Sequence, residues 1–364
     1  MPLGSSDRVL CSVRLGAVLL ALLQAAPGQA QGAGYLVPAL GKDRGQAEPE
    51  YKCEMPGAPV ITLETQSKYK QADSFRATVD ENANETYLKA VVPLRAYAKG
   101  LVQIANDYVR SNPAAAACAL DWLERWASAN AMTDMRSKQA LFNLGQTLGG
   151  FALAYLQIRN APDLQKDKKK RVEAWLKALG QQVVNFMDEN HEVSGRNNHR
   201  YWAGLAATAA GIAADDKRLA DWGVESARIG LSQITPEGTL PLEISRGKRA
   251  RDYHIYAAEP LVATAQLARS RGVDLYAENN GALRRLADRV VASLDDPSFF
   301  EKAAGTKQEA FSGDGTVPPN RIAWLEIYQS RFPSPSIEAV IASRRPLASS
   351  GLGGDLTLLF HGSQ

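Results

Sequence analysis

The sequence predicts an all-α protein in which antiparallel helical hairpins build a toroid or a bundle. Past residue 90, apolar residues recur at steps of three and four, the spacing that gathers them on one face of a helix. No alternation of apolar and polar residues lasts long enough to predict a sheet. The helical stretches differ in length and follow no fixed repeat, which argues against a regular repeat array.

The first 30 residues are predicted to be a secretory signal peptide. Arg8 and Arg14 precede the apolar run LGAVLLALLQAA (15–26), and the small residues PGQA follow it. The run is shorter than the roughly 20 residues of a membrane-spanning helix, and no later stretch is long and apolar enough. We therefore expect export to the periplasm, cleavage after Ala30, and no membrane contact by the mature protein. A retained N-terminal anchor is the alternative.

Two cysteines, Cys53 and Cys118, remain once the signal peptide is removed. In an oxidising compartment such a pair favours a disulfide. The bond would join the N-terminal arm to the first long helix, and in the chain-entropy model it would stabilise the fold by roughly 4 kcal/mol. Two buried free thiols are the alternative.

The charge balance limits the class of ligand. The chain carries 42 Lys and Arg against 39 Asp and Glu, and 45% of its residues are hydrophobic. A nearly neutral chain of this kind argues against nucleic-acid binding, which requires a basic face, but it allows a local basic cleft for an acidic ligand.

The helices follow in order along residues 31–330, the predicted main domain. Long apolar stripes are formed by Leu141, Leu144, Leu148, Phe151 and Tyr155, by Val172, Leu176, Leu179, Val183 and Phe186, and by Leu283, Leu286, Val290 and Leu294. Shorter stripes lie in 114–130, 203–214, 216–232 and 257–271, with breaks at 111–113, 188–190, 235–238 and 270–272.

Three further segments differ from these stripes. Residues 67–87 are polar and are expected to be helical, although residues 31–90 as a whole are irregular. The loop SGDGTVPP (312–319) has too few acidic residues for a calcium site. Residues 331–364 are expected to form a loosely packed or disordered tail.

Side chains suited to chemistry gather in two segments, NNHRYWAG (197–204) and KRARDYHIYA (248–257), each at a predicted helix boundary. We expect them to face one cavity. Their amides, imidazoles, arginines and tyrosines include only one carboxylate, Asp252, whereas a glycosidase ordinarily uses two. The chain has no metal-binding His pair at helical spacing, no phosphate loop and no cysteine nucleophile signature, so we expect no metal and no cofactor.

These side chains suit β-elimination in a uronate polymer. The C5 proton becomes removable only when the adjacent carboxylate is neutralised, which amide, imidazolium and guanidinium donors can do. A tyrosine can then act as base and acid if a neighbouring arginine lowers its pKa from about 10.

The same segments resemble the alginate lyases of polysaccharide lyase family 5. The resemblance runs in order through residues 50–330 and rests on SKY…DSFRAT (67–78), CALDWLERWA (118–127), NNHRYWAG, RGKRARDYHIYA, GVDLYAENNGALRRLADRV (272–290) and AWLEIY (323–328). It implies an α/α toroid, an incomplete α/α barrel, with a deep cleft. It also implies cleavage of poly-β-D-mannuronate by β-elimination in the Gram-negative periplasm, leaving a 4,5-unsaturated uronate at the non-reducing end.

The resemblance implies a role for four catalytic residues. Asn198, His199 and Arg249 would face the carboxylate of the sugar that loses its proton, and Tyr256, seven residues past Arg249, would be the acid and base. In mannuronate the C5 hydrogen and the C4 oxygen lie on one face, so one tyrosine can serve both. On a helix, seven residues span two turns, so direct contact needs an extended arginine or a nonhelical segment.

Substrate-binding roles are expected for a second set of residues. Tyr253 and His254 are also second-choice catalytic groups, and three residues of a lid-like segment would close over the polymer. The set is Lys68, Tyr69, Arg76, Trp202, Tyr253 and His254. Arg200, Arg251 and Asp252 depart from the family pattern and bear on which uronate fits. Trp122 and Trp126 are expected to be core residues.

Two other functions remain open on the sequence. One is a lyase of the same fold acting on another polyuronate, such as polyglucuronate. The other is a non-catalytic alginate-binding protein of a secretion complex. The expected partner is the anionic polysaccharide in each case, with contact to alginate biosynthesis and secretion proteins as a further expectation.

Overall fold

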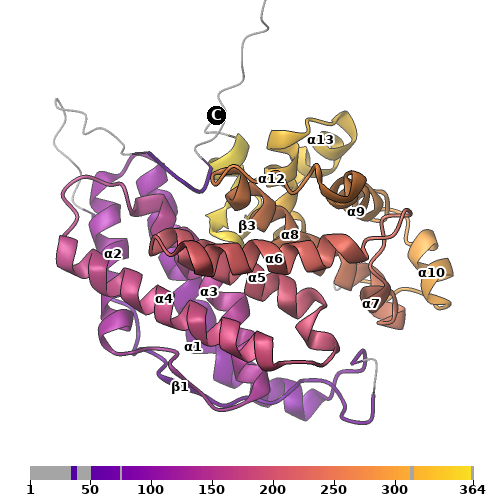
Figure 1. Cartoon of the computed structure of the whole chain (residues 1–364), viewed down its shortest axis with the longest axis horizontal. Coiled ribbons are helices and arrows are strands. Elements are labelled where there is room, and N and C mark those ends of the chain that lie inside the picture. Colours follow the sequence, from indigo (N-terminus) through magenta and orange to yellow (C-terminus); the bar gives the residue numbers. More distant parts are fainter. Residues whose placement is uncertain (1–33, 39–50, 74–75, 312–314, 362–364) are drawn as a thin grey trace, which may run out of the picture. The chain divides into compact units, whose positions relative to one another are not determined.

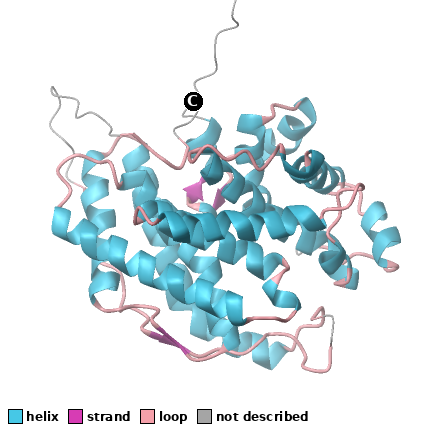
Figure 2. Ribbon diagram, in the orientation of Figure 1, coloured by secondary structure: helices cyan, strands magenta, loops and turns pink. Residues whose placement is uncertain are grey.

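The computed structural model describes residues 34–38, 51–73, 76–311 and 315–361, so the predicted signal peptide lies outside the described residues. These residues are mainly helical (Figure 2), which confirms the predicted all-α class. Consecutive helices pair as antiparallel hairpins around a shared core, which is the architecture of an α/α toroid. Among the described residues, no helix has both the length and the apolarity to cross a bilayer.

Thirteen α-helices are described, and short 3-10 turns connect several of them (Figure 1). Their bounds are α1 Glu81–Val109, α2 Pro113–Ser128, α3 Lys138–Ile158, α4 Lys166–Glu189, α5 Asn198–Ala213, α6 Lys217–Gln233, α7 Pro241–Ile244, α8 Ala250–Arg269, α9 Ala282–Ala292, α10 Ser298–Ala304, α11 Pro319–Ile322, α12 Trp324–Arg331 and α13 Pro335–Ile341.

The strands are two residues long. Parallel β1 (Thr62–Leu63) and β2 (Asp134–Met135) join the N-terminal segment to the loop before α3. Antiparallel β3 (Ala348–Ser349) and β4 (Gly354–Asp355) close a turn near the C-terminus.

Helix α5 is the centre of the core, because α3, α4, α6 and α8 all pack on it. Its small residues allow close approach, and α5 and α6 lie side by side in the middle of Figure 1. A Cβ at Gly223 of α6 would lie 2.2 Å from the Thr208 hydroxyl of α5, and one at Gly211 would lie 2.4 Å from the Ala220 backbone nitrogen. The glycines are therefore needed for this contact, which fixes the start of α5 within the fold.

The disulfide between Cys53 and Cys118 is confirmed, with 5.6 Å between the two Cα atoms. It fastens the N-terminal segment to α2, and the Trp122 indole N–H donates to the Glu54 carbonyl beside it. Trp126 is buried and stacks on Tyr97 at 3.6 Å between ring centroids, as expected for a core residue.

The prediction of a loose or disordered tail is wrong for residues 331–361. Leu347, Leu352, Leu356 and Leu359 are buried, and Figure 1 shows α12, α13 and β3 grouped together. The glycine-rich stretch resembles a linker in sequence, but Gly353 and Gly354 have positive φ and turn the chain close to α1. There the Asn106 side chain donates to the Gly353 carbonyl and accepts from the Asp355 amide.

The helix expected over 67–87 begins only at Glu81. Before it, an antiparallel bridge pairs Tyr69 with Val79. The Asp73 carboxylate accepts from the backbone amides of Ala77 and Thr78, so a side chain competes with helical hydrogen bonding. Asp80 then caps α1. We name residues 67–73 and 76–80 the bridge segment.

Removing the disulfide is expected to destabilise the protein without changing its fold. Cys53→Ser should lower the free energy of unfolding by about 4 kcal/mol, since the bond closes a loop of 65 residues. Urea unfolding of the mature protein measures the loss. Because reduction of the wild type should reproduce the loss, equal stability before and after reduction would contradict the prediction.

Candidate active site

The start of α5 presents Asn198 and His199. Asn197 caps the helix, because its side-chain oxygen accepts from the His199 backbone amide. Asn198 is fully buried and faces Glu243 of α7. The Glu243 carboxylate accepts from the Asn198 backbone amide at 2.9 Å and from Asn198 Nδ2 at 3.1 and 3.0 Å.

The His199 ring is neutral rather than the imidazolium that the sequence suggested. It stacks on Phe142 with 4.0 Å between ring centroids, and its Nδ1 is buried without a hydrogen-bond partner. Burial, with the positive charges of Arg246 and Lys138, lowers the His199 pKa to about 3. A neutral imidazole has one N–H donor and one acceptor nitrogen.

Arg246, between α7 and α8, is the electrostatic centre of the site. Its guanidinium carbon lies 3.5 Å from the centroid of the Tyr253 ring, and its charge also acts on His199 and Glu243. Its Nη2 donates to the carbonyl of Arg76 in the bridge segment. A turn at Gly247, where φ is +57°, folds Arg246 back over α8.

Tyr253 takes part in a chain of hydrogen bonds. Its hydroxyl lies 2.9 Å from the Tyr69 hydroxyl, and Arg249 Nη1 donates to Tyr69 at 2.6 Å. Burial raises the Tyr253 pKa above its usual value, while Arg246 and Arg249 act in the opposite direction. The resting side chain is therefore a neutral phenol, since burial outweighs the two cations. We name Asn198, His199, Arg246, Tyr253 and Tyr69 the polar cluster.

The structure does not place Arg249 beside Tyr256, as the resemblance implied. Arg249 bonds to Tyr69 and to Asp252. The guanidinium over the Tyr256 ring belongs to Arg321, at 5.1 Å, and burial raises the Tyr256 pKa. The segment 246–256 contains two Arg–Tyr pairs seven residues apart, Arg246–Tyr253 and Arg249–Tyr256. Spacing alone could not choose between them.

The structure assigns His254 to the core, so its predicted substrate-binding role is wrong. The ring is fully buried against Phe300. Its Nδ1 donates to the Ala250 carbonyl at 2.7 Å, and its Nε2 accepts from the Leu240 amide at 2.9 Å. With both nitrogens engaged by backbone, His254 has no group left for a ligand.

Trp202 also differs from its expected place. It is 4% exposed and packs on Tyr256, with 5.2 Å between ring centroids. A Cβ at Gly351 of the C-terminal turn would lie 3.3 Å from its ring. Trp202 therefore offers no open face on which a sugar could stack.

The other predicted binding residues lie in the bridge segment beside the cluster. Tyr69 contacts Tyr253, and the Lys68 ammonium lies 5.4 Å from the Tyr69 ring centroid. The Arg76 backbone contacts Arg246, while the Arg76 side chain is exposed.

Arg200, one of the departures from the family pattern, has a structural role. Its guanidinium lies 4.0 Å from the Trp222 ring centroid and bonds to Ser226 and Asp188. It therefore joins α4, α5 and α6. Asp252, another departure, links Arg249 to Arg321.

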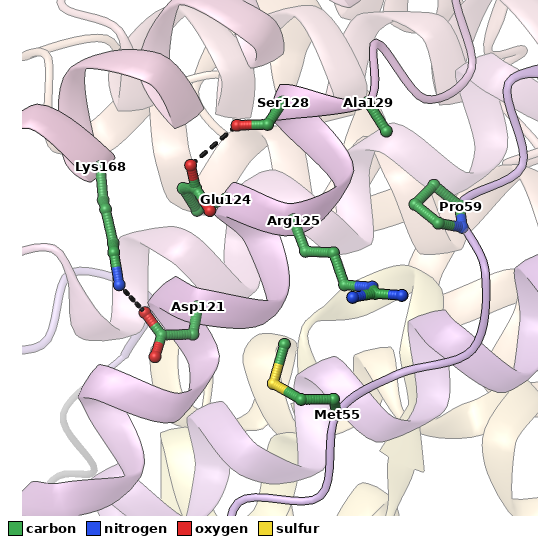
Figure 3. Close-up of a pocket in the computed structure, with 8 residues that line it drawn as sticks. All are labelled: Met55, Pro59, Asp121, Glu124, Arg125, Ser128, Ala129 and Lys168. Carbon is green, nitrogen blue, oxygen red and sulfur yellow. Dashed lines mark hydrogen bonds and ion pairs between the residues drawn. The ribbon is translucent and has the colours of Figure 1, made fainter.

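Figure 3 shows the residues that line a surface hollow at α2 and α4. The volume of the hollow is about 570 Å³. Lys168 forms an ion pair with Asp121, and the Ser128 hydroxyl donates to Glu124. None of the polar cluster residues lines this hollow. In the described part of the chain, no three His, Cys, Asp or Glu side chains gather in a metal-binding arrangement.

The α/α toroid and a cluster of arginine, tyrosine, amide and imidazole groups define a polysaccharide lyase of the toroid type. The family model described as alginate lyase matches residues 64–300. The chain belongs to the alginate lyase family.

Several relatives are similar over most of their length. A polysaccharide lyase of Stenotrophomonas maltophilia is 36% identical, covering 79% of this chain and 85% of that protein. An alginate lyase of Pseudomonas syringae is 34% identical, covering 85% and 83%. The crystal structure of alginate lyase A1-III from Sphingomonas species A1 matches with a TM-score of 0.74 and 25% identity, covering 91% of this chain and 97% of that one.

Two histidines with lowered pKa values predict acid sensitivity. Their pKa values, about 3 for His199 and about 4 for His254, lie below the 6.5 of an unfolded histidine. Both therefore add stability that is complete above pH 6.5 and is lost as the pH falls toward 4 and 3. Urea unfolding measured between pH 7 and pH 4 should show this decline.

His254→Gln should make that pH dependence shallower, because one of the two groups is removed. His191→Gln, a change at an exposed histidine, is the matched control and should keep the wild-type slope. Equal slopes in the wild type and His254→Gln would contradict the assignment.

Proposed function

We propose that this protein is a periplasmic lyase that cleaves alginate by β-elimination and prefers poly-β-D-mannuronate. Its products would be oligosaccharides with a 4,5-unsaturated uronate at the non-reducing end. The observation that carries the proposal is the contact of Arg246 with Tyr253, beside His199 and Asn198. Periplasmic location, and with it contact to alginate biosynthesis and secretion proteins, rests on the signal-like residues 1–30.

The first chemical task is to neutralise the uronate carboxylate. Arg246 supplies a permanent cation, and Asn198 and neutral His199 each supply an N–H donor. As the C5 proton leaves, negative charge spreads onto the carboxylate, so these donors bind the transition state more strongly than the ground state.

The second task is proton transfer, which we assign to Tyr253. Because the resting side chain is a neutral phenol, Tyr253 must first release its own proton to water. The phenolate then takes the C5 proton, and the phenol so formed gives that proton to the C4 oxygen when the glycosidic bond breaks, which restores the phenolate. Arg246 and Arg249 stabilise the phenolate, and the Tyr69 hydroxyl lies 2.9 Å from the Tyr253 oxygen. One tyrosine can serve as base and acid when the C5 hydrogen and the C4 oxygen lie on the same face of the sugar, as in mannuronate. This supports the proposed mannuronate preference.

A spacing in the solved relatives supports Tyr253 over Tyr256. Two structures of alginate lyase A1-III hold a tetrasaccharide, one in a His-to-Ala variant and one in a Tyr-to-Phe variant whose positions are 54 residues apart. His199 and Tyr253 are also 54 residues apart. Tyr256 lies three residues further on.

The bridge segment controls access in this proposal. Tyr253 is only 8% exposed, and Tyr69 lies over its hydroxyl. A polymer would therefore reach Tyr253 when Tyr69 moves aside with the bridge segment. Once the segment returns, Lys68 and Arg76 would contact the carboxylates of neighbouring sugars.

Two tyrosine variants test the assignment. Tyr253→Phe should lower kcat more than about 100-fold with polymannuronate, because it removes the acid and base, while polymer binding persists. The matched variant Tyr256→Phe should lower kcat less than about tenfold. The ultraviolet absorbance of the new C4–C5 double bond measures turnover, and calorimetry measures binding.

The assay compares three substrates, polymannuronate, polyguluronate and polyglucuronate. No absorbance change with any of them would reject the lyase, and faster turnover of polyglucuronate would reassign the substrate. If Tyr256→Phe is inactive and Tyr253→Phe is not, the acid and base role belongs to Tyr256.

A further inference from the structure

Glu243 is a buried carboxylate that no sequence motif pointed to. It lies in the four-residue helix α7, and both Glu243 and its partner Asn198 are fully buried. All three of its hydrogen bonds given above come from one residue, Asn198. Enclosing a carboxylate in a core is costly unless its partners are well placed, so this arrangement requires an explanation.

The geometry constrains the Asn198 amide. Nδ2 lies at nearly equal distances, 3.1 and 3.0 Å, from the two Glu243 oxygens. Seen from Nδ2, the two carboxylate oxygens lie too close together to accept one N–H each from a planar amide. One N–H is therefore shared between the two oxygens, and the second N–H is free to donate elsewhere. Asn198 Oδ1 is buried without a partner.

The Asn198 backbone amide adds a second point of attachment. It belongs to the first turn of α5, where amides lack a partner within the helix. Glu243 accepts this amide and the side-chain amide together, so both ends of the Asn198 residue are held. The positive end of the helix also favours a carboxylate at this place.

We propose that Glu243 is a positioning residue that orients Asn198, so that the remaining side-chain N–H faces the uronate carboxylate beside Arg246. This inference rests on the proposed lyase function. Without Glu243 the amide can rotate and present Oδ1, an acceptor that repels the carboxylate. Arg246 follows Glu243 by three residues, so one short turn sets the direction of two donors.

The surroundings of Glu243 favour this role over a purely structural one. Burial raises the Glu243 pKa, whereas the Asn198 hydrogen bonds and the Arg246 charge oppose that rise. Tyr201, the other titratable neighbour that Glu243 acts on, is buried on α5. Burial is the larger effect, and the two residues that oppose it, Asn198 and Arg246, are those proposed to meet the substrate.

A double-mutant cycle tests whether Glu243 acts through Asn198. Glu243→Gln keeps the shape but allows the Asn198 amide either orientation, and it should lower kcat about 10- to 100-fold with little change in KM. In an Asn198→Ala background the same change should lower kcat less than threefold, because the oriented group is already absent. Turnover of polymannuronate by the full mature chain is the readout.

The matched control is Glu326→Gln, another buried carboxylate, which bonds to Arg345 and Thr357 away from the polar cluster. It should lower stability and leave kcat within about twofold of the wild type. If Glu243→Gln does not fold, Glu243→Asp takes its place in the same cycle, since its shorter side chain keeps the charge but cannot hold both amides.

The outcomes separate the two proposals. A wild type without activity on any polyuronate rejects the proposed function. An active wild type in which the Glu243 change lowers kcat equally with and without Asn198 rejects the positioning role alone. An effect confined to KM also rejects it, because an oriented donor stabilises charge that develops in the transition state.

Discussion

The site depends on the placement of Arg246 over Tyr253. At 3.5 Å from the ring centroid, this guanidinium also acts on His199 and on Glu243. A cation at this point organises the other groups, because it favours a neutral imidazole and opposes the effect of burial on the phenol and the carboxylate. Its position follows from the turn at Gly247 and from the packing of α7 and α8 around α5.

Burial and the arginine charges together set the protonation states of the cluster. His199 is neutral because burial and positive neighbours both disfavour its protonation. Tyr253 is a neutral phenol because burial outweighs its two arginines. In the proposed function, a uronate would meet donors that are already placed around Tyr253, the condition under which electrostatic catalysis is most effective.

Parts of the fold that are remote from the cluster hold it in place. The close contact of α5 with α6 fixes the helix that begins at Asn198, and the ordered C-terminal turn packs behind Trp202. The disulfide fastens the N-terminal arm to α2, and that arm continues through β1 to the bridge segment, where Tyr69 meets Tyr253. The first and last segments of the domain thus both contribute to the site.

The sequence by itself determined the helical class, the disulfide and the two segments that carry the polar residues. Helical periodicity and local motifs are properties of neighbouring residues, so they are readable without coordinates. The sequence could not choose between the neighbouring pairs Arg246–Tyr253 and Arg249–Tyr256, which have the same spacing. The choice depends on the turn at Gly247, which places Arg246 over the Tyr253 ring. The sequence also could not show that His254 is a core residue and His199 a site residue. Both ring nitrogens of His254 are hydrogen-bonded to the backbone.

Only the tertiary structure shows how the glycine-rich C-terminal residues and Glu243 are packed. Residues 331–361 read as a tail because their leucines are few and separated, yet Asn106 and the surrounding helices bury them. Glu243 gave no signal because its importance lies in a contact with Asn198, 45 residues earlier in the chain. Such contacts depend on how helices pack, and helical packing brings together residues whose separation follows no local rule.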